Sequence, residues 1–133
     1  MAIEGVAGIS LFTTPDRFEA MRAFYTDVVG LTPDAPGGGI APHNVQRVAF
    51  TWGTPPDRLR LIVSTHDALS GPSADPNRVM PNFLTYDLEA HAETMRARGV
   101  EFTHGPVRMG WGGMMATFLD PDGNTLQLLQ PAD

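Results

Sequence analysis

The chain lacks cysteine and lysine altogether, although it has 133 residues. The absence of cysteine excludes disulfide scaffolds, thiolate metal sites and cysteine nucleophiles. The absence of lysine excludes Schiff-base chemistry and leaves arginine as the only permanently charged donor for an anionic ligand. Basic residues are also few, because nine arginines stand against 15 Asp and Glu residues and the formal net charge is -6. Binding to a phosphate backbone needs a basic face, so we expect no nucleic-acid partner.

Long apolar runs are missing as well. No run approaches the ~20 residues that span a bilayer, and residues 1–5 lack the basic and apolar regions of a secretory signal. We therefore expect a cytoplasmic protein with no membrane partner. The length favours a single domain over residues 1–133, in which neither half alone would bury enough surface to be stable.

What the sequence does contain is an internal repeat. Residues 49–62 align without a gap with residues 116–129, and both segments have the pattern of strand, polar Pro-containing turn and strand. Each is preceded by a strand-like run and a helix-like run that ends at a glycine, Gly30 in the first half and Gly99 in the second. We predict one supersecondary unit that is used twice.

Hydrophobic periodicity and turn residues predict the elements of the two modules. The first module, at about 5–65, is expected to hold a strand at 6–12, a helix at 15–29 with Thr14 as its N-cap candidate, and a hairpin of 47–52 with 59–63. A linker at about 66–80 follows. The second module, at about 81–131, is expected to hold a strand at 81–86, a helix at 88–98 capped by Asp87, a short strand at 100–103, a loop at 105–113, and a hairpin of 114–119 with 125–129.

Alternation divides the residues of each hairpin into two rows. One row is wholly apolar and is expected to pack against the helices; it holds Leu59, Leu61, Leu126 and Leu128. The other row is mixed and holds Arg60, Ile62, Gln127 and Leu129. A polar strand residue usually faces water, so when Arg60 is considered without the repeat, two placements are possible: the solvent-exposed surface or a cavity. The repeat favours the cavity, because Arg60 and Gln127 fall at equivalent positions.

Four separated motifs carry a family resemblance: FYTDVVGL at 24–31, RARGVEF at 96–102, WGG at 111–113 and FLDPDGNTLQ at 118–127. In this order, and over nearly the whole chain, they resemble the vicinal oxygen chelate superfamily, the group of glyoxalases, bleomycin-resistance proteins and extradiol dioxygenases. The resemblance implies an α+β fold in which two tandem βαβββ modules form a curved mixed sheet with a cup-shaped cavity. It also implies a homodimer, because the family commonly builds its cups by pairing modules between chains.

Enzymes of this family hold a divalent metal in the cup with histidine and carboxylate ligands at four strand positions. The resemblance carries these positions over to Ser10, Arg60, Pro81 and Gln127, and a shift of one residue gives Ile9 or Asn82. A guanidinium cannot ligate a metal, proline has no donor, and serine and neutral amides bind divalent ions weakly. We therefore expect no metal and no other cofactor. A divalent metal would require that this alignment is wrong.

The cup is expected to bind a small apolar or aromatic anion, with Arg60 as its charge partner and Gln127 as its hydrogen-bond partner. No acidic residue occupies an equivalent strand position to neutralise Arg60. The other candidate ligand-binding residues are Ser10, Phe12, Thr51, Ile62, Phe83, Trp111, Phe118 and Leu129. Trp111 could equally be buried at a dimer interface. Among the four histidines, His43 is the candidate base, beside a Gly-rich segment at 36–44 that is either a lid or a plain connector.

Three functions compete. The expected one is a metal-free protein that sequesters a small molecule, as in the bleomycin-resistance branch of the family. The second is a metal-dependent lyase, isomerase or dioxygenase, which the missing ligands disfavour. The third is a metal-independent enzyme in which Arg60 and a histidine perform acid-base work on an anionic substrate. Turnover without added metal would separate the third from the first.

Overall fold

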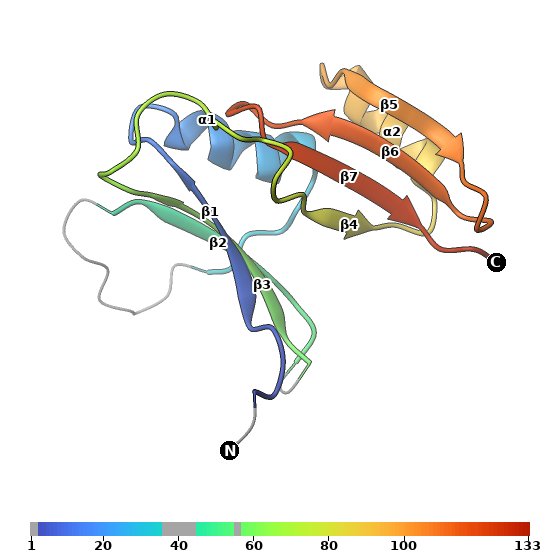
Figure 1. The fold of residues 1–133 in the computed structure, drawn as a ribbon, viewed down its shortest axis with the longest axis horizontal. Coiled ribbons are helices and arrows are strands. Elements are labelled where there is room, and N and C mark those ends of the chain that lie inside the picture. The colour runs from blue at the N-terminus through green and yellow to red at the C-terminus, as the bar shows by residue number, and fades with distance from the viewer. Residues whose placement is uncertain (1–2, 36–44, 55–56) are drawn as a thin grey trace. The chain divides into compact units, whose positions relative to one another are not determined.

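The computed structural model describes residues 3–35, 45–54 and 57–133. The chain divides into two compact units, Met1–Gly71 and Pro72–Asp133, and each unit has its own sheet and its own helix (Figure 1). The fold is α+β with two sheets of mixed strand direction, as the sequence predicts. Among the described residues, no helix is both long enough and apolar enough to cross a membrane.

The sheet of the first unit has three strands. β1 (Gly8–Thr13) runs parallel to the central strand β3 (Leu59–Thr65), and β2 (Arg47–Trp52) pairs with the other edge of β3 in the antiparallel direction. The alternating apolar residues of all three strands explain why these segments are extended. Between the helix and β2, the described residues form no strand, and residues 36–44 lie outside the described residues.

The helix of the first unit begins later than the sequence predicts. α1 (Phe18–Ala23) has Arg17 at its N-cap, with no side-chain cap hydrogen bond. The amide of Arg17 donates instead to the carbonyl of Thr14 (3.1 Å), so the proline-containing segment closes a turn before the helix starts. The prediction that Thr14 caps a helix starting at residue 15 is therefore wrong.

α1 continues into a π-helical turn, η1 (Phe24–Val28). The amide of Val29 donates to the carbonyl of Phe24 (2.9 Å), which is the i to i+5 bond of a π-helix. The extra residue in this turn makes Val29 the buried residue that follows Tyr25. Apolar residues at spacings of three and four predict a buried stripe of Phe18, Met21, Tyr25 and Val28. The prediction is correct at the first three residues, and Val29 is buried in place of Val28.

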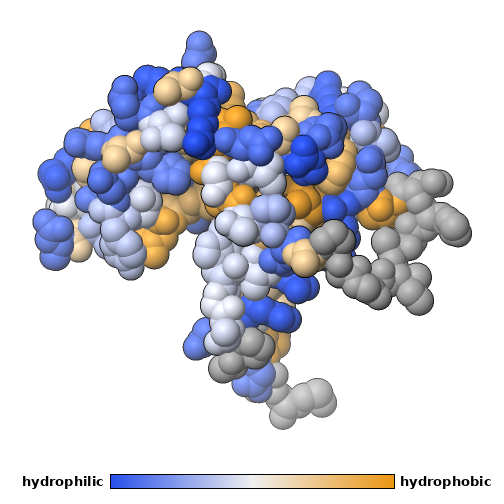
Figure 2. All heavy atoms as spheres, turned by 180° about the vertical axis from the view of Figure 1, so that it is seen from behind, coloured by the Kyte–Doolittle hydropathy of each residue, from blue (hydrophilic) through white to orange (hydrophobic). Residues whose placement is uncertain are grey.

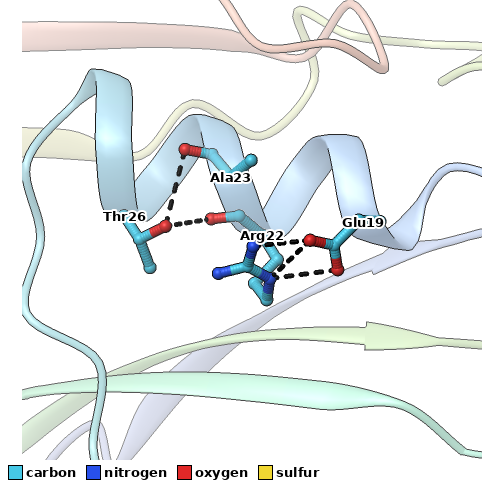
Figure 3. A network of polar contacts seen from close by, with 4 residues as sticks. All are labelled: Glu19, Arg22, Ala23 and Thr26. Carbon is cyan, nitrogen blue, oxygen red and sulfur yellow. Dashed lines mark hydrogen bonds and ion pairs between the residues drawn. The ribbon is translucent and has the colours of Figure 1, made fainter.

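Figure 3 shows the polar contacts of this helix. Nε of Arg22 donates to the Glu19 carboxylate (3.0 Å), and this hydrogen bond lowers the pKa of Glu19 and raises the pKa of Arg22. The Thr26 hydroxyl donates to the carbonyl of Arg22 (2.7 Å) and lies 3.5 Å from the carbonyl of Ala23. Thr26 thus satisfies backbone carbonyls where α-helical bonding changes to π-helical bonding.

The second unit is a complete βαβββ module. Its elements are β4 (Asn82–Leu84), α2 (Leu88–Ala97), β5 (Phe102–Arg108), β6 (Met114–Leu119) and β7 (Thr125–Gln130). The sheet order is β4-β7-β6-β5, with β4 parallel to β7 and the other pairs antiparallel. Figure 1 shows α2 beside β5 and β6.

Both ends of α2 agree with the sequence. The Asp87 carboxylate accepts a hydrogen bond from the amide of Ala90 (3.2 Å), which is the predicted N-cap. Gly99 follows the helix with φ of 95°, and Gly30 follows η1 with φ of 89°. This left-handed conformation suits glycine, so both glycines end their helices as predicted.

β5 is longer than the sequence predicts. It runs to Arg108 instead of ending near residue 103, and it passes through Gly105 and Pro106. Its register with β6 shifts between Phe102 and His104 and again between His104 and Val107. These irregularities accommodate residues that break a regular strand. The loop predicted at 105–113 is therefore wrong over its first half.

Part of the predicted linker at 66–80 belongs to the second unit. The amide of Ser73 donates to the carbonyl of Asp122 (2.9 Å). Thr125 donates through its amide to the carbonyl of Pro76 (3.2 Å) and through its hydroxyl to the side-chain oxygen of Asn77 (2.6 Å). Residues 73–77 are thus tied to the turn between β6 and β7.

In each unit, one face of the sheet packs against the helix. Leu61 and Val63 of β3 and Leu126 and Leu128 of β7 are buried, and α1 contacts β3 as α2 contacts β7. The predicted apolar row is confirmed at these leucines but not at Leu59, which is 39% exposed at the first position of β3. We call the opposite face of each sheet its open face. Arg60, Ile62, Gln127 and Leu129 lie on the open faces and are half-buried.

Candidate functional site

Arg60 lies on the open face of the first unit, near the start of the central strand β3. In the strand register it lies between Gly8 of β1 and Thr51 of β2. A Cβ atom added to Gly8 would be 2.7 Å from the carbonyl oxygen of Arg60 and 3.2 Å from its Cβ. Only glycine fits this close approach, and its lack of a side chain leaves Arg60 uncovered from β1.

The Nε edge of Arg60 is held by a short hydrogen-bonded chain. Its Nε donates to the hydroxyl of Thr51 (3.3 Å) and lies 3.7 Å from a carboxylate oxygen of Asp34. The Thr51 hydroxyl donates to the same oxygen of Asp34 (2.6 Å). The amide of Asp34 donates to the carbonyl of Ala49 (2.8 Å), which anchors this residue to β2. The sequence-based reasoning considered strand positions only, and none of them holds an acidic residue; Asp34 reaches Arg60 from the segment after the helix instead.

The other end of the Arg60 side chain has unused donors. Within the described part of the chain, no group accepts a hydrogen bond from either terminal nitrogen, and the side chain is 39% exposed. A guanidinium has five N–H groups, so four of them have no acceptor among the described residues. The charge of Arg60 does not by itself require an anion, because Asp34 balances it. The unused donors are what the site offers to a ligand.

The second unit has an equivalent polar row across its open face. Gln127 of β7 lies between Asn82 of β4 and Thr117 of β6, and His104 of β5 is opposite Thr117. Nε2 of Gln127 donates to the Thr117 hydroxyl (3.3 Å) and lies 2.9 Å from the sulfur of Met115. The side-chain oxygen of Gln127 accepts no hydrogen bond from any described residue. The centre of this face is therefore an acceptor, whereas the centre of the first is a donor.

The two hairpins differ in length by one residue, which changes the predicted site. Thr51 and Arg60 pair nine positions apart, whereas Thr117 and Gln127 pair ten positions apart. Thr51 therefore matches Thr117, and the gapless alignment that matches it with Phe118 is wrong by one residue. Phe118 pairs with Leu126 and is fully buried on the helix side of the sheet. It does not lie on the open face.

The first strand of each unit is also shifted relative to the prediction. The residue beside Gln127 is Asn82 and not Pro81, and the residue beside Arg60 is Gly8 and not Ser10. Pro81 is buried and accepts a hydrogen bond from the amide of Gln127 (3.0 Å) through its carbonyl. Phe83, a predicted ligand-binding residue, is wrongly placed as well, because its register partner Leu128 belongs to the helix-side row.

The other predicted residues that lie on open faces are Ser10, Phe12, Thr51 and Ile62 in the first unit and Leu129 in the second. Trp111 lies in the turn between β5 and β6 and is 53% exposed. Its ring passes so close to Gly113 that an added Cβ would overlap it. His43, the predicted base, lies outside the described residues. Whether any of these residues binds a ligand stays a prediction.

Three residues of the open faces, Gly8, Thr117 and His104, and the loop residue Asp34 escape the sequence-based prediction. Of these four, Thr117 alone has a sequence signal, since a hairpin alignment with one inserted residue would match it with Thr51. The contact of Asp34 with Arg60 has no periodic signal, because it depends on where a loop returns to the sheet. The sequence places His104 beside a loop because Gly105 and Pro106 follow it, but the irregular strand β5 includes all three residues.

The sequence model of the protein family described as the Glyoxalase/Bleomycin resistance protein/Dioxygenase superfamily matches residues 10–128. The chain belongs to this superfamily. Similar solved structures include a glyoxalase family protein from Bacillus anthracis, with 15% identity over 98% of both chains and a TM-score of 0.72. TnmS3, an antibiotic-binding protein from Streptomyces sp. CB03234, is 25% identical over 99% of both chains, with a TM-score of 0.69. FosX, a fosfomycin resistance protein from Listeria monocytogenes, is 16% identical over 99% of this chain and 94% of its own, with a TM-score of 0.67.

No curated protein matches the chain. The identities to the glyoxalase family protein and to FosX are low enough that these likenesses show the fold alone. The family match confirms the resemblance that the four sequence motifs carry.

The central residues do not fit the divalent-metal site that the superfamily's enzymes use. Gly8 has no side chain and Arg60 cannot ligate a cation, while Asn82 and Gln127 are neutral amides. Among the residues that the structure describes, no three histidine, aspartate or glutamate side chains are grouped so that they could hold a metal ion. A metal-free site stays a prediction, which rests on the chemistry of these four residues.

Proposed function

We propose that this protein binds a small apolar or aromatic anion on the open face of its first sheet, without a metal, and sequesters it. The observation that carries the proposal is Arg60. Its Nε is held by Thr51 and Asp34, while its terminal nitrogens have no partner among the described residues. An arginine held in this way on the central strand of a sheet is a prepared donor for an oxygen acceptor.

Apolar side chains beside Arg60 support a ligand with an apolar body. Ile62 is half-buried on the same strand, and Phe12 on β1 is 47% exposed. Figure 2 shows apolar residues that reach the surface among hydrophilic ones. Ligand sites combine apolar walls with a few polar groups, and exposed apolar clusters mark such sites.

The similarity to TnmS3 supports binding over catalysis, because that protein is described as antibiotic-binding. The same fold serves enzymes, so the fold itself does not decide between them. The homodimer that the family resemblance implies remains part of the proposal.

The test is calorimetric titration with 2-naphthoate, which combines an aromatic body with a single negative charge. Arg60→Met is expected to weaken binding by about tenfold to a hundredfold, because a hydrogen bond to a charged group contributes ~1.5–3 kcal/mol. Arg58→Met is the matched control, since Arg58 is exposed in the same hairpin. Thermal melting of both variants checks the fold. Equal affinity of wild type and Arg60→Met for 2-naphthoate would sink the proposal.

A second candidate function is a metal-independent enzyme, and His104 is the observation that favours it. This histidine is exposed and lies in the polar row with Thr117 and Gln127. Histidine is the commonest acid-base catalyst near neutral pH. Mass spectrometry of a bound molecule after long incubation separates the two functions. An unchanged molecule supports binding alone, whereas conversion that disappears in His104→Ala supports the enzyme.

A further inference from the structure

We infer that Thr51 and Asp34 are positioning residues that make Arg60 a two-pronged donor for a carboxylate, so that the ligand is a carboxylate monoanion and not a phosphate dianion. The inference rests on the proposed function and names the ligand class of the same site. It follows from the direction of the hydrogen bonds, the shape of the guanidinium and the local charge.

The direction of the hydrogen bonds is fixed by the single hydrogen of the Thr51 hydroxyl. The distance of 2.6 Å to Asp34 assigns this hydrogen to the carboxylate, which can only accept. The hydroxyl oxygen is then left to accept from Nε of Arg60 (3.3 Å). Thr51 therefore links the strand arginine to a carboxylate that is itself anchored to the backbone of β2 through its amide.

The shape of the guanidinium decides which edge remains for a ligand. Its Nε–H points along one side of the planar group, and this side is occupied by Thr51 and Asp34. The far edge presents two parallel N–H groups, one from each terminal nitrogen. These two donors match the two oxygens of a planar carboxylate in a bidentate pair.

The local charge favours one negative charge over two. Arg60 and Asp34 form an ion pair whose side chains are 39% and 31% exposed, so their charges cancel at a distance. A phosphate dianion loses more hydration free energy on binding than a carboxylate does. The Arg60–Asp34 pair has no net charge, so its attraction for the dianion offsets little of this loss. The Asp34 charge also repels a dianion about twice as strongly as a monoanion.

The experiment compares 2-naphthoate with 2-naphthyl phosphate, which share the ring and differ in the anionic group. Both are titrated into the full chain at about pH 8, where the phosphate monoester is a dianion. Wild type is expected to prefer 2-naphthoate by about fivefold or more. Thr51→Val is expected to lose most of this preference by weakening 2-naphthoate binding, while Thr51→Ser keeps the hydroxyl and restores it. Thr94→Val, on the exposed side of α2, is the control for removal of a threonine hydroxyl.

Asp34→Asn provides a second measurement if Thr51→Val is poorly folded. It keeps an acceptor for Thr51 and removes the charge, so the preference for 2-naphthoate is expected to narrow by about fivefold. A wild-type protein that prefers the phosphate, or a preference that survives both Thr51→Val and Asp34→Asn, would overturn the inference while leaving the proposed function in place. If wild type and Arg60→Met bind 2-naphthoate alike, or neither binds it, the proposed function fails and the inference fails with it.

Discussion

Replacing Asp34 by asparagine is expected to tighten the binding of an anion at Arg60, even though it breaks an ion pair. The carboxylate of Asp34 lies 3.7 Å from Nε of Arg60. A ligand carboxylate on the far edge of the guanidinium would be roughly 6–7 Å from Asp34, where two unit charges repel by about 0.6 kcal/mol at the dielectric constant of water and about 2.5 kcal/mol at an effective value of 20. The partial exposure of both side chains places the repulsion between these limits, at about 1 kcal/mol.

Removing a repulsion of about 1 kcal/mol raises the affinity for a monoanion about fivefold. A dianion is repelled twice as strongly, so Asp34→Asn would raise its affinity about 25-fold. The asparagine side-chain oxygen can still accept from the Thr51 hydroxyl, so the position of Arg60 is expected to be kept. Calorimetry with 2-naphthoate measures the effect, and 2-naphthamide is the neutral control whose affinity should not change. If Asp34→Asn bound 2-naphthoate no more tightly than wild type, the repulsion argument would be refuted.

Three further predictions concern the rest of the molecule. Asp87→Ala should lower the stability by about 1 kcal/mol, seen in chemical denaturation, because the Asp87 carboxylate caps α2; an unchanged stability would show that this cap contributes nothing. Elemental analysis of protein purified without chelator should find no stoichiometric zinc, nickel, iron or manganese, and a near-stoichiometric amount would show that the central residues are misidentified. Sedimentation at micromolar concentration should give a dimer of the 14.4 kDa chain, and a monomer would remove the homodimer from the proposal.

The elements that the sequence predicts well are those in which local signals agree. β2 and β6 have the predicted bounds because each alternates cleanly and is bounded by turn residues. Asp87 and Gly99 mark the two ends of α2 in the way that caps and left-handed glycines usually do. Helix α1 begins late for a related reason, since Thr14 and the following proline support a turn as well as they support a cap.

The errors at the site have a different cause, which is the period of a strand. Side chains alternate between the two faces, so an alignment that slips by one residue moves a residue from the open face to the core. Phe118 takes the place of Thr117 in the prediction for this reason alone. No periodic pattern could have indicated Asp34, because the residue contacts Arg60 from outside the strands. Arg60 has a charged partner, so an unpaired charge is no reason to expect an anion there. The unused donors of its terminal nitrogens still favour an anionic ligand.

The internal repeat places a polar residue and a threonine side by side on the open face of each sheet, but the hydrogen bonds of the two threonines differ. In each unit a threonine on the neighbouring strand accepts a hydrogen bond from the central polar residue, Arg60 or Gln127. The Thr51 hydroxyl donates a hydrogen bond to a carboxylate (2.6 Å), whereas the acceptor of the Thr117 hydroxyl among the described residues is the sulfur of Met115 (3.9 Å). A charged acceptor holds a donor firmly, and a flexible thioether holds it weakly. Arg60 is therefore the better-fixed of the two groups, so we expect the first unit to discriminate between anionic groups more sharply than Gln127 of the second unit discriminates between donors.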